Sequence, residues 1–143
     1  MRFEKLPESL LTWNDPPHRL SRTHPRYAPE AFYAVKADYL AHWLARHNPH
    51  HPDIVVVGAG RVTRRRVEKL IARGIRVKAW ADLDRRKVGR VYHGAPVIHH
   101  DDLPPPGTAF VVPFVSSTGA PEHIRALLES RGFVRGRDFI EAA

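Results

Sequence analysis

The chain has no cysteine, a single methionine and no long apolar run in its 143 residues. Without cysteine there can be no disulfide, no thiolate metal ligand and no cysteine nucleophile, and the absence fits a reducing, cytoplasmic location. No apolar stretch approaches the roughly 20 residues that cross a bilayer. The N-terminal stretch MRFEKLPESLL also lacks the apolar centre of a secretion signal. We therefore expect a cytoplasmic protein with no membrane span.

The charge is strongly positive, with 23 Lys and Arg against 15 Asp and Glu, for a formal net charge of +8. This balance is compatible with nucleic acid, anionic lipid or phosphorylated small molecules as partners. Single-stranded nucleic acid is usually bound by aromatic side chains interleaved with basic ones. The basic segment RVTRRRVEK has no aromatic residue, so the sequence does not favour nucleic acid.

From residue 53 onward, apolar strand-like runs alternate with helical patterns. The strand-like runs are DIVVV, IRVKAWA, VYHGAPVI, AFVVPFV and a closing DFIEA, and the helical segments span 61–73 and 120–131. Such alternation is typical of an α/β fold with a parallel sheet. We expect a Rossmann-like, three-layer domain over residues 49–143.

Residues 1–48 are predicted to form an extension with a different character. Several prolines are spread over residues 1–28, and this predicts irregular structure there. A helix is expected over 29–46, and HNPHHP then breaks it. The apolar stripe expected to cover the sheet or another domain consists of Phe32, Val35, Tyr39, Leu40, Trp43 and Leu44.

The turn Gly58-Ala59-Gly60 joins a strand to a helix, as in the first turn of a nucleotide-binding βαβ unit. Gly58 permits a tight turn, and Gly60 lets the backbone approach a phosphate at the helix N-terminus. Arginines crowd this positively charged helix start, where they are unfavourable unless an anion binds. Thr63 stands where the dinucleotide-binding pattern has Gly or Ala. The larger threonine side chain is expected to narrow the room for a dinucleotide.

Two further groups of polar residues lie at the same expected sheet edge. Asp82 follows Gly58 by 24 residues, where an acidic side chain holds ribose hydroxyls; alternatively, Asp82 or Asp84 caps a short helical turn. Ser116 and Ser117 either face a ligand or cap the helix near residue 121. The candidate nucleotide-binding residues are Gly58, Ala59, Gly60, Arg61, Val62, Arg64, Arg65, Asp82, Asp84, Ser116 and Ser117.

Ten histidines raise the question of a metal site. One group lies in the linker over 47–51, and a second pair, His99 and His100, precedes Asp101 and Asp102. Neither group has a defined zinc-binding spacing. We expect solvated loop side chains and no metal. A Ser–His pair without a GxSxG turn predicts no catalytic triad, so no catalytic residue is expected.

Residues 53–143 resemble the N-terminal Rossmann-like domain of bacterial sugar acyltransferases of the sialic-acid and bacillosamine type. The resemblance rests on VVVGAGRV, WADLDRRKVGRVYHGAPVI and FVVPFVSSTGAPEHIRALLESRGF. In that family the glycine turn and the acidic strand end border a nucleotide-sugar site. The resemblance thereby implies such a role for Gly58, Gly60, Asp82 and Asp84. The β-helix that completes those acyltransferases is absent, so their reaction is not implied.

Residues 1–46 are similar to the C-terminal region of bacterial family 2 glycosyltransferases, through LPESLLTWNDPPHRLSRTHPRYAPEAFYAVKADYLAHWL. Trp13 and Ser21 match the aromatic and serine of the family pattern, whereas Asn14 and Pro16 replace its arginine and histidine. The resemblance implies an upstream catalytic domain that holds the metal and the donor.

We therefore expect an accessory, non-catalytic domain of a glycosyltransferase that binds a nucleotide or nucleotide-sugar such as UDP or a UDP-sugar. One alternative is an NAD(P)-binding, oxidoreductase-type domain. A second alternative is a scaffold that has kept the fold and lost the ligand.

Overall fold

The computed structural model describes residues 29–142. The irregular stretch expected over residues 1–28, which carries Trp13 and Ser21 of the glycosyltransferase-like pattern, lies outside the described residues.

A five-stranded sheet forms the middle layer, with the strand order β3-β4-β2-β1-β5. Strands β1, β2, β4 and β5 are parallel, and β3 forms an antiparallel hairpin with β4. The strand bounds are β1 Asp53–Val57, β2 Arg76–Asp82, β3 Val91–Tyr92, β4 Ala95–His99 and β5 Val111–Pro113. The expected α/β fold with a mostly parallel sheet is confirmed.

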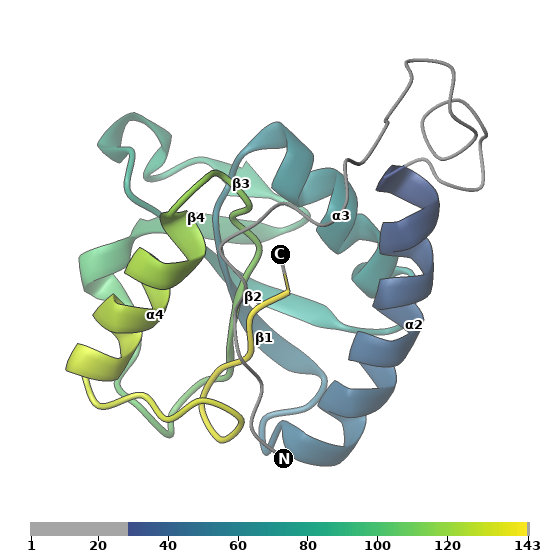
Figure 1. Ribbon diagram of the computed structural model, residues 1–143. Helices are drawn as coiled ribbons and strands as arrows, with labels where there is room; N and C mark the ends of the chain where they lie inside the picture. Colours follow the sequence, from purple (N-terminus) through teal and green to yellow (C-terminus); the bar gives the residue numbers. More distant parts are fainter. Residues whose placement is uncertain (1–28, 143) are drawn as a thin grey trace, which may run out of the picture.

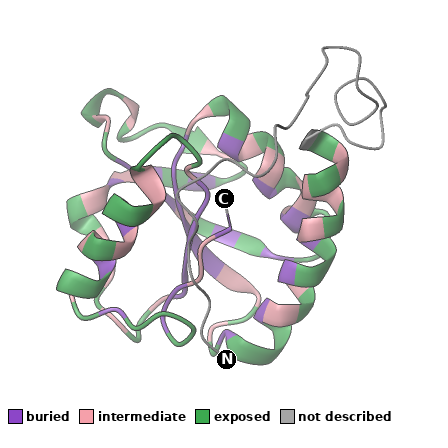
Figure 2. Cartoon of the chain, in the orientation of Figure 1, coloured by how far each residue is buried: buried purple, intermediate pink, exposed green. Residues whose placement is uncertain are grey.

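The helices cover both faces of this sheet (Figure 1). Helices α2, Pro29–His47, and α3, Arg61–Ile71, lie on one face, and α4, Ala120–Ser130, lies on the other. Alternate residues of β1 serve the two faces: Ile54 and Val56 pack toward α2 and α3, whereas Val55 and Val57 pack toward α4. Because both faces are covered, residues 54–57 of β1 form an unbroken apolar run and are buried, while buried residues are purple in Figure 2.

The C-terminal segment runs beside β5 without forming a regular strand. The Ile140 amide donates to the Val111 carbonyl at 3.2 Å, and the Ala142 amide donates to the Pro113 carbonyl at 2.8 Å. Phe139 makes isolated parallel bridges and is fully buried. The edge strand expected from DFIEA is therefore present only as a bridged, extended segment.

Helix α2 packs against the core with only part of the expected apolar stripe, namely Leu40, Trp43 and Leu44. Its buried residues are Ala37, Leu40 and Leu44, whereas Phe32, Val35 and Tyr39 are 62%, 57% and 75% exposed. Small and aliphatic side chains allow closer approach between helices than large aromatic ones. The expectation was therefore wrong for Phe32, Val35 and Tyr39, whereas Trp43 lies against Phe110 of the core. The helix belongs to the same hydrophobic core as the sheet.

The strand order reverses at β1, and this positions the candidate site. From β1 the chain continues to β2 and β4 on one side, and then crosses to place β5 on the other side of β1. In open parallel sheets, ligands bind at the carboxyl ends of the strands at such a reversal. Here that place lies between the ends of β1 and β5.

Candidate functional site

A cavity of about 740 Å³ opens at this reversal, between the carboxyl edge of the sheet and α4. Its volume falls within the range of small-molecule sites, roughly 300–1,000 Å³. Its wall is mainly apolar, with a few polar groups that come from strand ends and loops. The lining residues include Val57, Gly58, Gly60, Thr63, Asp82, Lys87, His100, Val115, Ser117, Thr118, His123, Ile124 and Leu127.

The two glycines of the turn have different local requirements. Gly58 has φ +105, and a Cβ there would lie 2.9 Å from Val115 Cγ2 and 3.3 Å from Thr63 Oγ1. Only glycine fits this conformation and this space. Gly60 has φ −68, and a Cβ added there would meet no atom within 4 Å, so packing does not require glycine at this position. Thr63 is buried, and the cavity stays open beside it.

Asp82 anchors the glycine turn to the end of β2. Its carboxylate accepts hydrogen bonds from the Ala59 amide at 2.8 Å and the Asp84 amide at 2.9 Å, and Lys87 Nζ lies 3.0 and 3.1 Å from its two oxygens. Burial raises the pKa of Asp82, but these amides and Lys87 outweigh it, so its pKa lies below the ordinary value. The Ala59 amide is thus engaged within the protein, and a ribose would have to share acceptor sites that are already in use.

Asp84 is the N-cap of a short 3₁₀ helix, η2, Arg85–Lys87. Its side chain accepts from the Arg86 amide at 3.0 Å and from the Arg86 guanidinium at 3.0 and 3.2 Å. The capping alternative is confirmed for Asp84, and the cavity wall within the described residues does not include it.

The arginines of α3 do not gather around the cavity. Among the described residues that line it there is no arginine. Arg61 and Arg65 are exposed, while the Arg64 guanidinium lies over the Tyr92 ring, 3.8 Å from its centroid. Arg66 lies 3.9 Å from the centroid of the Tyr33 ring and donates to Ser116 Oγ at 2.9 Å. Stacking on two tyrosines, which come from α2 and from the hairpin, stabilises the crowded charges without an anion.

The N-terminus of α3 borders the cavity through Gly60 and Thr63. Its N-cap is Gly60, with no side-chain cap, and its first backbone bond runs from the Arg64 amide to the Gly60 carbonyl. The amides of residues 61–63 therefore have no intrahelical partner. Unpaired amides and the helix dipole together favour an anion at this place.

The N-terminus of α4 meets the same cavity but offers fewer donors. Its N-cap is Gly119, with φ +77 and no side-chain cap, so the expectation that Ser116 or Ser117 caps this helix is wrong. The Ala120 amide donates to the Ser117 carbonyl at 3.0 Å. Ser117 lies in the cavity wall, whereas Ser116 is bonded to an arginine of α3.

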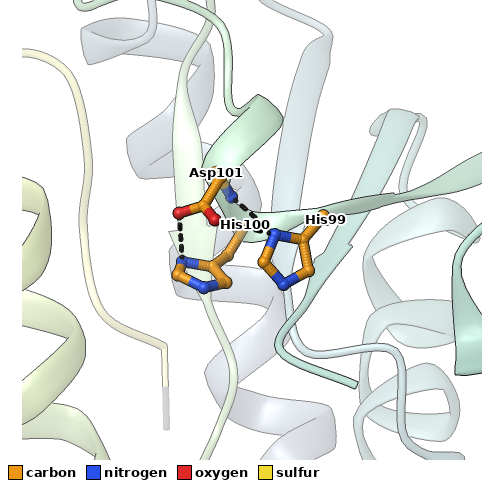
Figure 3. A group of neighbouring side chains, drawn as sticks. All are labelled: His99, His100 and Asp101. Atoms are coloured by element: carbon orange, nitrogen blue, oxygen red, sulfur yellow. Dashed lines mark hydrogen bonds and ion pairs between the residues drawn. The ribbon is translucent and has the colours of Figure 1, made fainter. Parts of the chain in front are cut away.

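The side chains of His99, His100 and Asp101 form a cluster (Figure 3), and His100 lines the cavity. His99 Nδ1 is 3.1 Å from Asp101 Oδ2, and His100 Nδ1 is 3.5 Å from Asp101 Oδ1. The expectation of solvated loop histidines is wrong for His99, which is only 7% exposed. It is the last residue of β4, opposite Asp82 of β2. The alternation of APVIH is the sequence signal that places it on the buried face; helical zinc spacing does not reveal it.

No helix among residues 29–142 is long and apolar enough to cross a membrane. No protein-family model, curated protein or solved structure matches the chain.

Proposed function

We propose that this domain binds a nucleotide or nucleotide-sugar in the cavity at the carboxyl edge of the sheet, as a non-catalytic accessory domain of a glycosyltransferase. The observation that carries the proposal is the position of the cavity. It lies at the strand-order reversal, and the uncapped N-terminus of α3 forms part of its wall.

In this proposal the diphosphate lies against the amides of residues 61–63. The cationic Lys87, which also lines the cavity, adds charge on the same side. The base or the sugar occupies the apolar part between Val115, Ile124 and Leu127. Asp82 supports the site by fixing the turn through Ala59, and the exposed arginines of α3 add only long-range attraction from the surface.

The resemblance of residues 53–143 to nucleotide-sugar-binding domains supports the class of ligand, and the resemblance of residues 1–46 supports the glycosyltransferase context. An NAD(P)-binding, oxidoreductase-type domain is less well supported, because the carboxylate of Asp82 already accepts from the Ala59 and Asp84 amides.

A scaffold role is the second candidate, and one observation favours it. The outer face of α2 presents Phe32, Val35 and Tyr39 to solvent, all large and more than half exposed. Exposed apolar side chains in one stripe are typical of surfaces that contact another protein.

Thermal unfolding with UDP, UDP-sugars, NAD and NADP separates these functions. A ligand at 100 times its Kd adds about 2.7 kcal/mol to the free energy of unfolding. We expect stabilisation by UDP or a UDP-sugar, lost in Thr118→Trp, which fills the exposed rim of the cavity, and kept in the control Arg65→Ala, which lies outside it. A shift with NAD or NADP alone supports the oxidoreductase-type domain, and no shift with any ligand supports the scaffold.

A further inference from the structure

We propose that His99, His100 and Asp101 form a binding site for a divalent transition-metal ion of the zinc type at the wall of the cavity. The proposal does not depend on the nucleotide, since all three ligands belong to β4 and to the 3₁₀ helix that follows it, η3, His100–Asp102.

The donor set matches the chemistry of such an ion. Two imidazole nitrogens and one carboxylate oxygen are ligands that zinc prefers, and the three ligand atoms lie within 4.8 Å of one another. Tetrahedral zinc with bonds of about 2.0–2.1 Å places neighbouring ligand atoms roughly 3.3 Å apart. His99 Nδ1 lies 3.1 Å from Asp101 Oδ2 and His100 Nδ1 lies 3.5 Å from Asp101 Oδ1, so each imidazole is near this separation from one of the two carboxylate oxygens.

One ring nitrogen of the cluster is poorly satisfied without an ion. His100 Nδ1 is buried and has no hydrogen-bond partner within the described part of the chain. His99 Nδ1 differs, because it accepts from the Asp101 amide at 3.4 Å and also lies 3.1 Å from Asp101 Oδ2. A buried polar atom left unpaired is unfavourable by about 1–3 kcal/mol. An ion bound beside the Asp101 carboxylate, next to which the His100 ring lies in Figure 3, would give His100 Nδ1 a partner.

Arg131 supports the proposed ligands from outside. Its guanidinium donates to Asp101 Oδ1 at 2.7 Å and to the His100 carbonyl at 2.7 Å. Carboxylate ligands of metals are commonly held by such hydrogen bonds. The positive charge of Arg131, and of Arg85 at 4.0 Å from Asp101 Oδ2, opposes a cation. We therefore expect weaker binding than at a closed structural zinc site.

Three protein ligands leave a fourth coordination position for water or for a bound molecule, as in zinc sites that are not purely structural. His100 lines the cavity, so the open position adjoins the space in which a ligand would lie.

The test uses the full chain and Zn²⁺ or Co²⁺ alone, with calorimetry for stoichiometry and visible absorption for Co²⁺ geometry. We expect one ion per chain. His100→Gln and Asp101→Asn should each weaken binding at least about tenfold. The matched control is His42→Gln, an exposed histidine on α2 outside the cluster, which should bind as the unaltered chain does.

Imidazole ¹⁵N spectra of the unaltered chain give a second measurement that needs no variant. On addition of Zn²⁺, the ring nitrogens of His99 and His100 should shift first. Absence of binding would overturn the proposal. So would binding that His100→Gln and Asp101→Asn leave unchanged, or shifts confined to histidines of the 47–51 turn. Because no nucleotide is present, failure here is distinct from failure of the proposed function.

Discussion

The buried carboxylate of Asp82 offers the sharpest test of how the glycine turn is held. Asp82→Ala removes the acceptor for the Ala59 amide, the Asp84 amide and the Lys87 ammonium at once. Hydrogen bonds to a charged group contribute about 1.5–3 kcal/mol each, and a buried amide left unpaired is unfavourable by about 1–3 kcal/mol. These terms do not add fully, because the site borders the cavity and water can enter. We expect a loss of about 3 kcal/mol.

Urea denaturation measures this loss directly, and thermal unfolding should show a fall in Tm of about 10 °C. Asp82→Asn keeps one acceptor oxygen but loses the charge, so it should give an intermediate loss. Asp84→Ala is the matched control. It removes only the partly exposed cap of a single 3₁₀ turn and should decrease stability by about 0.5–1 kcal/mol.

If Asp82→Ala destabilises the protein no more than Asp84→Ala does, the carboxylate does not hold the turn and our account of the site is wrong. A different outcome would restore the ribose role predicted from the sequence: Asp82→Asn with unchanged stability and lost nucleotide binding.

Three further predictions concern the surroundings of the site. Gly58→Ala should destabilise the fold by about 2–4 kcal/mol in urea denaturation, since φ is +105 and the added methyl meets another side chain. The control Gly60→Ala, with φ −68 and open space around the added methyl, should change stability by less than about 1 kcal/mol. Equal losses of stability in the two variants would contradict this. Arg64→Ala should lower stability by about 1–2 kcal/mol by removing the guanidinium stacked on its tyrosine, whereas the exposed Arg65→Ala should be neutral in the same assay. Burial raises the pKa of Glu141, but its two arginine partners outweigh this effect and lower the pKa. The ionised carboxylate therefore stabilises the fold above about pH 4.3, the ordinary glutamate pKa, and this stabilisation is lost below it. Glu141→Gln should be less stable at neutral pH and lose less stability on acidification, and a pH profile parallel to that of the unaltered chain would refute this.

The layer order could be predicted from the sequence because alternating strand and helix patterns leave few arrangements of a parallel sheet. The same patterns placed α3 and α4 to within two residues of their observed ends. The role of Gly58 also followed from local chemistry, since the turn from β1 to α3 needs a positive φ.

The partners of the charged side chains could not be predicted, because they come from distant parts of the chain. Arg64 and Arg66 stack on Tyr92 and Tyr33, from the hairpin and from α2. Helical spacing fixes which residues share a face, but it does not say which loop or helix meets that face.

The cavity and the histidine cluster depend on tertiary packing in a similar way. The cavity wall joins the turn after β1, the loop after β5 and the first turns of α4. The alternation along β4 indicates that His99 is buried, but its place opposite Asp82 comes from the register between two strands, which the linear sequence does not state.

A titration of the ¹⁵N-labelled chain with a UDP-sugar, followed by amide chemical shifts, tests the central claim most directly. We predict saturable shifts at the amides of Arg61, Val62 and Thr63, together with those of residues 117–120 across the cavity. Unchanged spectra at millimolar ligand would contradict the claim. Shifts confined to the outer face of α2 would contradict it equally.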